Sequence, residues 1–315
     1  MMNRRDFLKT AATLAALGVV SKVAGAVKAP AAAAEKSGPV DLVAIRGGEP
    51  EEMFDKAIRE LGGMEKFVKK GQTVLVKPNI GWDRPVEAAA NTNPKLVARI
   101  VRRCKEAGAK EVYVFDTTCS RWDLAYKSSG IADAARKEGA IVVGGDSASD
   151  KAYLKKYYVD EENPKAKRLK KFKWHRLAKE CDVFINVPVL KHHGGPGMTS
   201  AMKNLMGTVS KDTQRYFHAN DLNQCIADIC AYRKPDLTVI DAYRIMLKRG
   251  PRGVDQSDVK LMKYQLLGTD MVALDTAAAA VIGFDPRRIG HIALGEKAGV
   301  GTRNLKKLNI KRITV

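Results

Sequence analysis

The chain has 315 residues, 45% of them hydrophobic, and carries a formal net charge of +20 at pH 7. This length and apolar content indicate a globular protein with one large domain or two small ones, and the five cysteines are too few and too scattered for a disulfide framework. The basic surplus is typical of proteins that bind polyanions such as anionic lipid headgroups, cell-wall polymers or an acidic protein.

Residues 1–34 predict a secretion signal rather than part of the fold. Arg4 and Arg5 precede a weakly apolar, alanine-rich run from Thr10 to Val20, and small residues suited to cleavage follow it. This pattern is typical of a twin-arginine signal peptide, and the run is too poor in large apolar side chains for a good membrane span. An amphipathic or uncleaved anchor helix is the alternative.

Removal of this signal leaves a basic protein. Residues 1–34 hold five basic residues and one acidic residue, so the net charge of the remainder is +16. We therefore expect a periplasmic or otherwise exported protein, for which nucleic acid is an unfavoured partner. Twin-arginine translocation moves folded proteins, often with a cofactor bound, and this favours a cofactor without establishing one.

In the N-terminal half, apolar runs of strand character alternate with amphipathic helices. The predicted strands are residues 40–45, 73–76, 112–115 and 140–143. The predicted helices are residues 50–61, a segment that begins at Pro94 with Asn93 as its N-cap, and residues 131–138. Residues 117–130 are predicted as a loop.

Residues 151–179 interrupt this alternation with a basic segment. The segment holds eleven Lys or Arg residues and three acidic residues, with aromatic residues between them. We interpret it as an inserted surface subdomain or flap. It is either a solvated basic face or a docking site for an acidic partner or an envelope polymer.

The alternation resumes after this insert. The predicted strands are residues 183–185, 237–240, 261–267 and 308–314. The predicted helices are a segment that begins at Thr199 and residues 222–232, 271–282 and 286–298. Short apolar strands that alternate with helices predict an α/β fold with a mostly parallel sheet and helices on both faces. We expect a single domain over residues 35–315 with the insert within it.

Polar side chains follow four of the predicted strands, and ligands bind outside the carboxyl ends of strands in open α/β sheets. The residues concerned are Lys77 and Asn79, Asp116, Asn186 with Lys191, His192 and His193, and Asp241. Their convergence at one edge of the sheet predicts an active or binding site. Strand exits or helix caps explain Lys77, Asn79, Asp116 and Asp241 about as well.

The third of these strand ends has the highest density of chemical groups. We place Lys191, His192 and His193 on a loop with three glycines that leads into a helix at Thr199. The start of that helix resembles an anion cradle, although the motif is weak. Adjacent imidazoles in an extended segment point to opposite sides, so one of the two histidines faces the site.

Side-chain chemistry assigns a role to each candidate. The predicted catalytic residues, as nucleophile, proton carrier or base, are Lys191, His192 and Asp116. The predicted ligand-binding residues are Lys77, Asn79, Asn186, Lys203 and Asn204. The metal is unknown, and its candidate ligands are His192, His193 and Asp241. The isolated His175 and His218 are predicted to have structural roles.

Several motifs together resemble the domain of unknown function 362 family. They are Lys77-Pro78-Asn79 with the strand before it, Asn93-Pro94, Gly108-Ala109 with Val112–Asp116, Asn186–His192, Lys203-Asn204 with Gly207, and Asp270–Asp275. The resemblance covers nearly all of the chain after the signal. The lysine, histidine and glycine segment is also distantly similar to the N-terminal domain of nickel-dependent lactate racemase.

The resemblance implies an association with iron–sulfur proteins, because some members of that family carry a fused ferredoxin-like segment. This chain departs from the pattern, since the C-terminal cysteine clusters are absent and none of its five cysteines lies in a C-x-x-C motif. The cofactor is therefore unknown. A metal or iron–sulfur association would need a partner or another cofactor.

Two functions of different classes follow from these observations. The first is an exported enzyme, redox or metal-assisted, that acts on a small anionic ligand. The second is a non-catalytic periplasmic anion-binding or accessory protein for a redox partner, which we expect to be acidic.

Overall fold

The computed structural model describes residues 38–145 and 151–315. Its strands are β1 (Leu42–Arg46), β2 (Thr73–Pro78), β3 (Glu111–Val114), β4 (Ile141–Val142), β5 (Tyr158–Glu162), β6 (Lys171–His175), β7 (Val183–Val187), β8 (Val189–His193), β9 (Gly197–Thr199), β10 (Leu237–Met246), β11 (Val259–Gly268) and β12 (Ile310–Thr314). Its helices are α2 (Pro50–Glu60), α3 (Pro94–Glu106), α4 (Trp122–Ser128), α5 (Ile131–Lys137), α6 (Lys151–Tyr157), α7 (Arg176–Glu180), α8 (Ala201–Asn204), α9 (Lys211–Ala219), α10 (Leu222–Tyr232), α11 (Met271–Ile282) and α12 (Gly290–Lys297).

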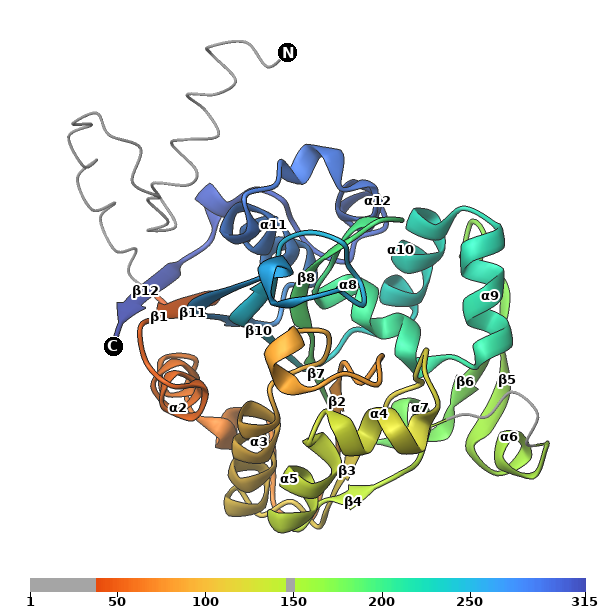
Figure 1. The fold of residues 1–315 in the computed structure, drawn as a ribbon, viewed down its shortest axis with the longest axis horizontal. Coiled ribbons are helices and arrows are strands. Elements are labelled where there is room, and N and C mark those ends of the chain that lie inside the picture. Colours follow the sequence, from red (N-terminus) through yellow and green to blue (C-terminus); the bar gives the residue numbers. More distant parts are fainter. Residues whose placement is uncertain (1–37, 146–150) are drawn as a thin grey trace.

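A mixed sheet forms the centre of the fold, and its main path runs β12-β1-β11-β10-β7-β2-β3-β4 (Figure 1). Neighbours on this path are parallel, except that β11 runs antiparallel to both β1 and β10. Strand β8 continues the sheet beside β10, and β9 pairs with β8. The mostly parallel α/β fold predicted from the sequence is confirmed.

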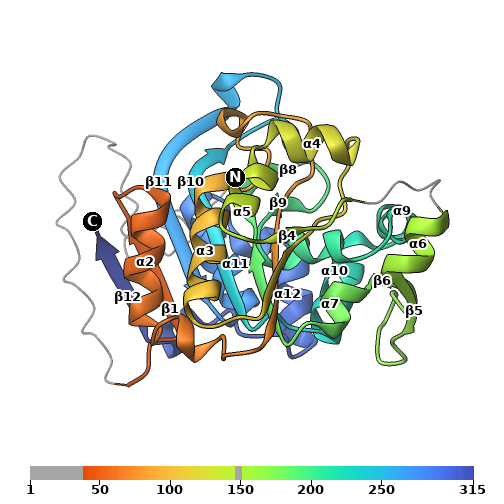
Figure 2. The ribbon, with the colours of Figure 1, turned by 90° about the horizontal axis from the view of Figure 1, so that it is seen from below.

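Helices cover both faces of the sheet (Figures 1 and 2). Helices α2, α3 and α5 pack with the strands into one apolar core, and α8, α10, α11 and α12 contribute to the other. Neighbouring residues of one strand enter different cores, since Leu75 belongs to the second while Val74 and Val76 belong to the first. Strands buried on both faces carry continuous apolar runs, which is why the sequence shows no polar alternation.

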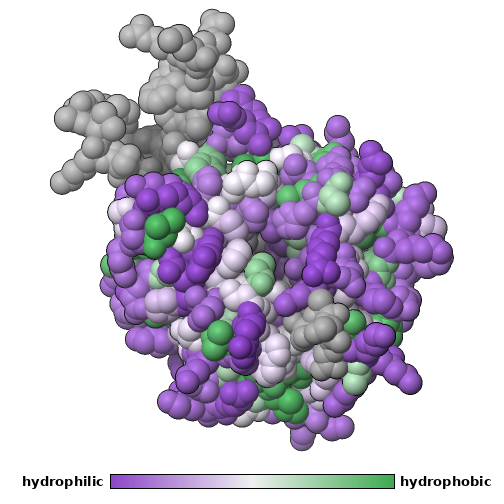
Figure 3. Space-filling view, turned by 45° about the vertical axis from the view of Figure 1, so that its right-hand side comes forward, coloured by the Kyte–Doolittle hydropathy of each residue, from purple (hydrophilic) through white to green (hydrophobic). Residues whose placement is uncertain are grey.

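The surface is mostly polar outside these cores. Figure 3 shows one face that is covered largely by hydrophilic side chains, with apolar ones in small separate groups. Within the described residues, no helix is long and apolar enough to cross a membrane.

The basic insert packs against the domain more closely than its composition predicts. Strands β5 and β6 form an antiparallel pair flanked by α6 and α7. The Trp174 indole donates to Thr208 Oγ1 (3.1 Å), and Tyr158 shares a hydrogen bond with Thr117 (2.8 Å). The structure therefore does not confirm a flap. The proposed domain limits, 1–34 and 35–315, stay predictions.

Three local predictions were wrong. Residues 122–128, predicted as a loop, form α4, because burial of Ala125 and Tyr126 outweighs the polar composition around them. Lys191, His192 and His193 lie on β8 rather than on a loop, because β10 is long enough to pair with both β7 and β8. Thr199 ends β9, and the helix after it begins at Ala201.

Candidate functional site

The carboxyl ends of β2, β3 and β7 meet α8 at one edge of the sheet. Lys77 of β2 and Asn186 of β7 are register partners. The alternation of side chains along each strand places both of them on the face of the sheet that α8 covers. A cavity of about 220 Å³ lies there. Its lining residues are Asn79, Gly81, Trp82, Asp116, Thr117, Cys119, Lys191, His193, Thr199, Lys203, Asn204, Met206, Gly207, Gln214, His218 and Pro251.

A buried ion pair joins two of these strand ends. Lys77 Nζ lies 2.7 Å from Asp116 Oδ1, and the two side chains are 0% and 2% exposed. Lys77 also donates to the Pro78 carbonyl (2.9 Å), while Asp116 Oδ2 accepts from the Ile80 N–H (2.6 Å). Burial lowers the pKa of Lys77 and raises the pKa of Asp116, and the attraction between the two charges opposes both shifts.

Gly207 closes over this ion pair. A Cβ atom on Gly207 would lie 1.8 Å from Asp116 Oδ1 and 2.6 Å from Lys77 Nζ. The Gly207 carbonyl also accepts from the Thr117 N–H (3.1 Å). Any side chain at this position would displace the charged groups, so the chain needs glycine here for close approach.

Lys191 is a buried amine whose hydrogen-bond partners are neutral. It is 1% exposed, and its Nζ donates to Asn79 Oδ1 (2.8 Å) and to the Ala90 carbonyl. Burial, which is the largest cause, lowers the pKa of Lys191 to about 7; the charge of Lys203 acts in the same direction, and Cys119 and Asp116 oppose it. A large fraction of Lys191 is therefore the neutral amine at neutral pH.

A chain of side-chain amides links Lys191 to α8. Asn79 Nδ2 donates to Asn204 Oδ1 (3.2 Å), and Asn204 Nδ2 donates to Asn186 Oδ1 (2.8 Å). Asn186 in turn donates to the Ala201 carbonyl (2.9 Å). Asn186 is fully buried behind Asn204, so it positions the cavity wall rather than lining it.

Lys203 projects from α8 into the same cavity. Its Nζ contacts the Met206 sulfur at 3.4 Å, and burial lowers its pKa to about 8. The start of α8 is held by Asp275 of α11, whose two carboxylate oxygens accept from the Ala201 N–H (2.7 Å) and the Met202 N–H (3.0 Å). These N–H groups are occupied within the protein. The predicted anion cradle at this helix start was therefore wrong.

The β8–β9 register decides which histidine faces the cavity. Lys191 pairs with Thr199 and His193 with Gly197, whereas His192 pairs with Met198, which lies in the apolar core. Paired residues of antiparallel strands share a face, so His193 lines the cavity and His192 does not. His192 Nδ1 instead accepts from the Gly250 N–H (3.1 Å). The structure thus does not bring His192 to the cavity as a catalytic group.

The cavity environment keeps His193 neutral. Burial, with smaller contributions from Lys203 and Lys191, lowers the pKa of His193 to about 2. Its Nδ1 accepts from the Gly195 N–H (3.1 Å). A neutral imidazole with an accepting Nδ1 carries its proton on Nε2, so His193 is a hydrogen-bond donor in the cavity wall.

The candidate metal ligands do not come together. Asp241 is buried away from the cavity, where it accepts from the Asn93 N–H (2.7 Å) and the Tyr243 N–H (3.0 Å). Burial raises its pKa to about 6. Asp241 therefore joins β10 to the start of α3. Within residues 38–145 and 151–315, no three His, Cys, Asp or Glu side chains are grouped to hold a metal ion.

The cavity also includes residues that sequence reasoning missed. Cys119 is a free, exposed thiol in the wall, and His218, predicted to be structural, lies there too. Trp82, Met206 and Gln214 also belong to the wall. Cys119 follows Asp116 closely in the chain, so the strand-end argument could have found it, whereas α9, which carries Gln214 and His218, had no such signal.

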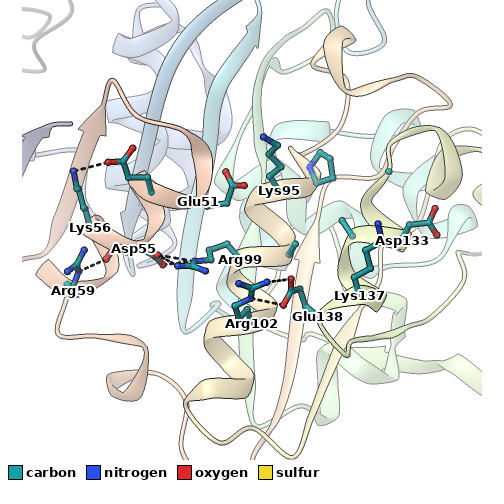
Figure 4. A pocket seen from close by; sticks show the side chains of 15 residues that line it. Glu51, Asp55, Lys56, Arg59, Lys95, Arg99, Arg102, Asp133, Lys137 and Glu138 are labelled. Carbon is teal, nitrogen blue, oxygen red and sulfur yellow. Dashed lines mark hydrogen bonds and ion pairs between the residues drawn. The ribbon is translucent and has the colours of Figure 1, made fainter.

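A larger groove lies elsewhere, on the outer side of α2, α3 and α5 (Figure 4). Its volume is about 690 Å³. Its arginines bind carboxylates of the same groove, as Arg99 pairs with Asp55 and Arg102 with Glu138. The charges in this groove largely satisfy one another, whereas Lys191 and Lys203 lack such partners, so the smaller cavity is the better candidate site.

Residues 74–280 match the family described as "Domain of unknown function (DUF362)". The chain belongs to the DUF362 family. The matched residues include every strand end at the cavity and also Asp275 of α11. Residues 1–21 match the twin-arginine translocation signal, so this DUF362 protein is exported by that pathway. These signal residues lie outside the described part of the chain.

A thylakoid-associated protein of Synechocystis sp. is 27% identical to this DUF362 protein over 252 residues, which are 77% of this chain and 73% of that protein. Among solved structures, a Thermotoga maritima protein has a TM-score of 0.46 at 15% identity and covers 79% of this chain. The lactate racemase apoprotein from Thermoanaerobacterium thermosaccharolyticum has a TM-score of 0.45 at 14% identity and covers 76%. The chain spans 60% and 57% of those two solved chains.

Replacement of Gly207 by alanine should separate the buried ion pair. Because a methyl group there would overlap Asp116 and Lys77, we expect the free energy of unfolding to fall by about 3 kcal/mol. Urea denaturation measures this change. In the control Gly194→Ala, the new methyl group would meet its nearest heavy atom at 4.0 Å, and the change should stay within about 0.5 kcal/mol. Equal stability of the two variants would contradict the close packing over the ion pair.

Replacement of Asp275 by asparagine should release the start of α8, because an amide cannot accept from both N–H groups. We expect a loss of about 1–3 kcal/mol in stability and a rise of the Lys203 pKa from about 8 toward its ordinary value. NMR titration of ¹³C-methylated lysines reports that pKa. The control Asp228→Asn removes a similar buried acceptor of two N–H groups, those of Arg168 and Leu169, away from the cavity. If Lys203 titrates identically in both variants, Asp275 does not position it.

Proposed function

We propose that this exported DUF362 protein binds a small anion in the cavity and acts on it through Lys191. One observation carries the proposal: two amines, Lys191 and Lys203, line one small cavity, and no carboxylate of residues 38–145 or 151–315 forms an ion pair with either. Buried or half-buried cations without a counter-ion reduce stability. An anionic ligand would supply the missing partner.

The remaining charges leave the cavity positive. Lys77 and Asp116 neutralise each other, and lowered pKa values keep His193 and His218 uncharged. Lys203 therefore contributes a positive charge near neutral pH and Lys191 a partial one. A volume of about 220 Å³ is below the roughly 300–1,000 Å³ of sites for drug-sized ligands. A small carboxylate or phosphate suits this size.

Lys191 supports chemistry as well as binding. An amine with a pKa of about 7 exchanges protons readily at neutral pH, and as a neutral amine it is also a nucleophile. We therefore favour an enzyme. The alternative, a non-catalytic anion-binding or accessory protein for a redox partner, would use the same amines and would show binding without turnover.

The redox or metal-assisted chemistry predicted from the sequence receives less support than the anionic ligand. Of its three candidate ligands only His193 lines the cavity, whereas His192 and Asp241 lie outside the wall, where each accepts from a backbone N–H. A metal or iron–sulfur association through an acidic partner protein stays a proposal. The basic insert is its candidate contact, since Lys165, Lys167 and Lys170 are exposed there.

Anion binding should depend on Lys203. We expect Lys203→Met to weaken binding of phosphate or oxalate at least tenfold, because a charge-assisted hydrogen bond contributes about 1.5–3 kcal/mol. Isothermal titration calorimetry measures the dissociation constants. The control Lys127→Met removes an exposed lysine of α4 and should leave them unchanged. Equal affinities of both variants and the parent would exclude this cavity as the binding site.

Activity should be confined to a narrow pH range. The neutral form of Lys191 increases as the pH rises through about 7, whereas the charged form of Lys203 is lost as the pH rises through about 8. A reaction that needs both forms therefore has a bell-shaped rate profile with its maximum between these values. Once a reaction has been identified, its rate measured from pH 5 to pH 10 checks this profile. In Lys203→Met, the fall in rate on the alkaline side should disappear. A profile that rises steadily to pH 10 in the parent would contradict these roles.

A further inference from the structure

The hydrogen bonds of Lys191 match a neutral amine. A neutral amine has two N–H donors and one lone pair, and an ammonium group has three donors. Lys191 Nζ donates to two acceptors, Asn79 Oδ1 and the Ala90 carbonyl. These acceptors use both donors of the neutral form and leave the lone pair free, so the described residues orient this nitrogen as a nucleophile in the cavity wall.

The other lysines of the site are held differently. Lys77 is bound to the Asp116 carboxylate, which favours its charged form, and it is fully buried outside the cavity wall. Among residues 38–145 and 151–315, Lys203 contacts only the weak acceptor sulfur of Met206, so it keeps donors for an anion. One amine is thus arranged for attack and another for charge recognition within one cavity.

We propose that the substrate is a 2-oxo acid and that Lys191 forms an imine with its carbonyl group. This inference rests on the proposed anion-binding function and names the class of anion. A 2-oxo acid carries a carboxylate directly beside an electrophilic carbon, which matches an ammonium group and a neutral amine on the walls of a small cavity. His193, with its proton on Nε2, is a donor for a second oxygen of the ligand.

The step is balanced without an oxidant or a reductant. The Lys191 lone pair attacks the carbonyl carbon, and one of the two N–H protons moves to the carbonyl oxygen to give a neutral carbinolamine. The remaining N–H proton and the hydroxyl group then leave together as water to give the imine. Lys203 holds the carboxylate in both states, and protonation of the imine nitrogen makes the adjacent carbon acidic.

Reductive trapping tests this inference on the folded protein. The protein is incubated with pyruvate and cyanoborohydride at pH 7.5, and peptide mass spectrometry locates the carboxyethyl adduct. We expect Lys191 to be modified at least about a hundredfold faster than exposed lysines such as Lys127, because a pKa near 7 increases the neutral fraction by more than that factor. Oxalate, which binds as an anion but offers no ketone, should protect Lys191 in the parent protein.

Two variants extend the test. Lys191→Met should lose the fast adduct while circular dichroism shows a retained fold, and Lys203→Met should slow trapping of pyruvate far more than trapping of acetone, which has no carboxylate. Protection by oxalate keeps the test decisive if Lys191→Met fails to fold. If the adducts spread over exposed lysines at equal rates, the imine is excluded. If the imine is excluded but calorimetry still shows binding of oxalate and phosphate, the proposed anion-binding site is retained and only the imine proposal is rejected.

Discussion

The cavity depends on the buried ion pair between Lys77 and Asp116. The pair fixes the end of β2 against the end of β3, and Gly207 packs directly on it, so it also fixes the 3₁₀ helix Leu205–Thr208 that follows α8. Removal of one partner from a buried pair typically costs about 3–5 kcal/mol, because the other charge is left without compensation. This contact therefore sets the relative positions of groups that are far apart in the chain.

Three lysines of one site illustrate how surroundings change the chemistry of a single residue type. Lys77 has a carboxylate, Lys191 has two neutral oxygen acceptors, and Lys203 has a thioether sulfur. Asp116 is the only carboxylate among the described residues that line the cavity, and it pairs with Lys77, which lies behind the cavity wall. Buried or half-buried amines without counter-ions are unfavourable for stability, and such local violations of good packing are expected where a protein binds or reacts.

Much of this arrangement could be predicted because it follows from strand order. Parallel strands end at one edge, so Lys77, Asn79, Asp116 and Lys191 had to converge if the α/β prediction was right. The failures concern contacts with distant segments. The choice between His192 and His193 depends on pairing with residues 197–199, and the start of α8 depends on Asp275, far along the chain. The requirement for glycine at position 207 likewise cannot be predicted until the position of the ion pair is known.

The antiparallel strand β11 has a consequence for how this exported protein matures. Strand β1 lies directly after the signal segment, yet both of its hydrogen-bonded neighbours, β11 and β12, come from residues 259–314. The Asp41 N–H also bonds to the Asn309 carbonyl (2.9 Å). A nascent chain therefore cannot cover one side of its first strand until residues 259–268 are made, and the other side stays open until residues 310–314 follow. Pairing of the strand nearest the export signal thus comes late in the assembly of the sheet.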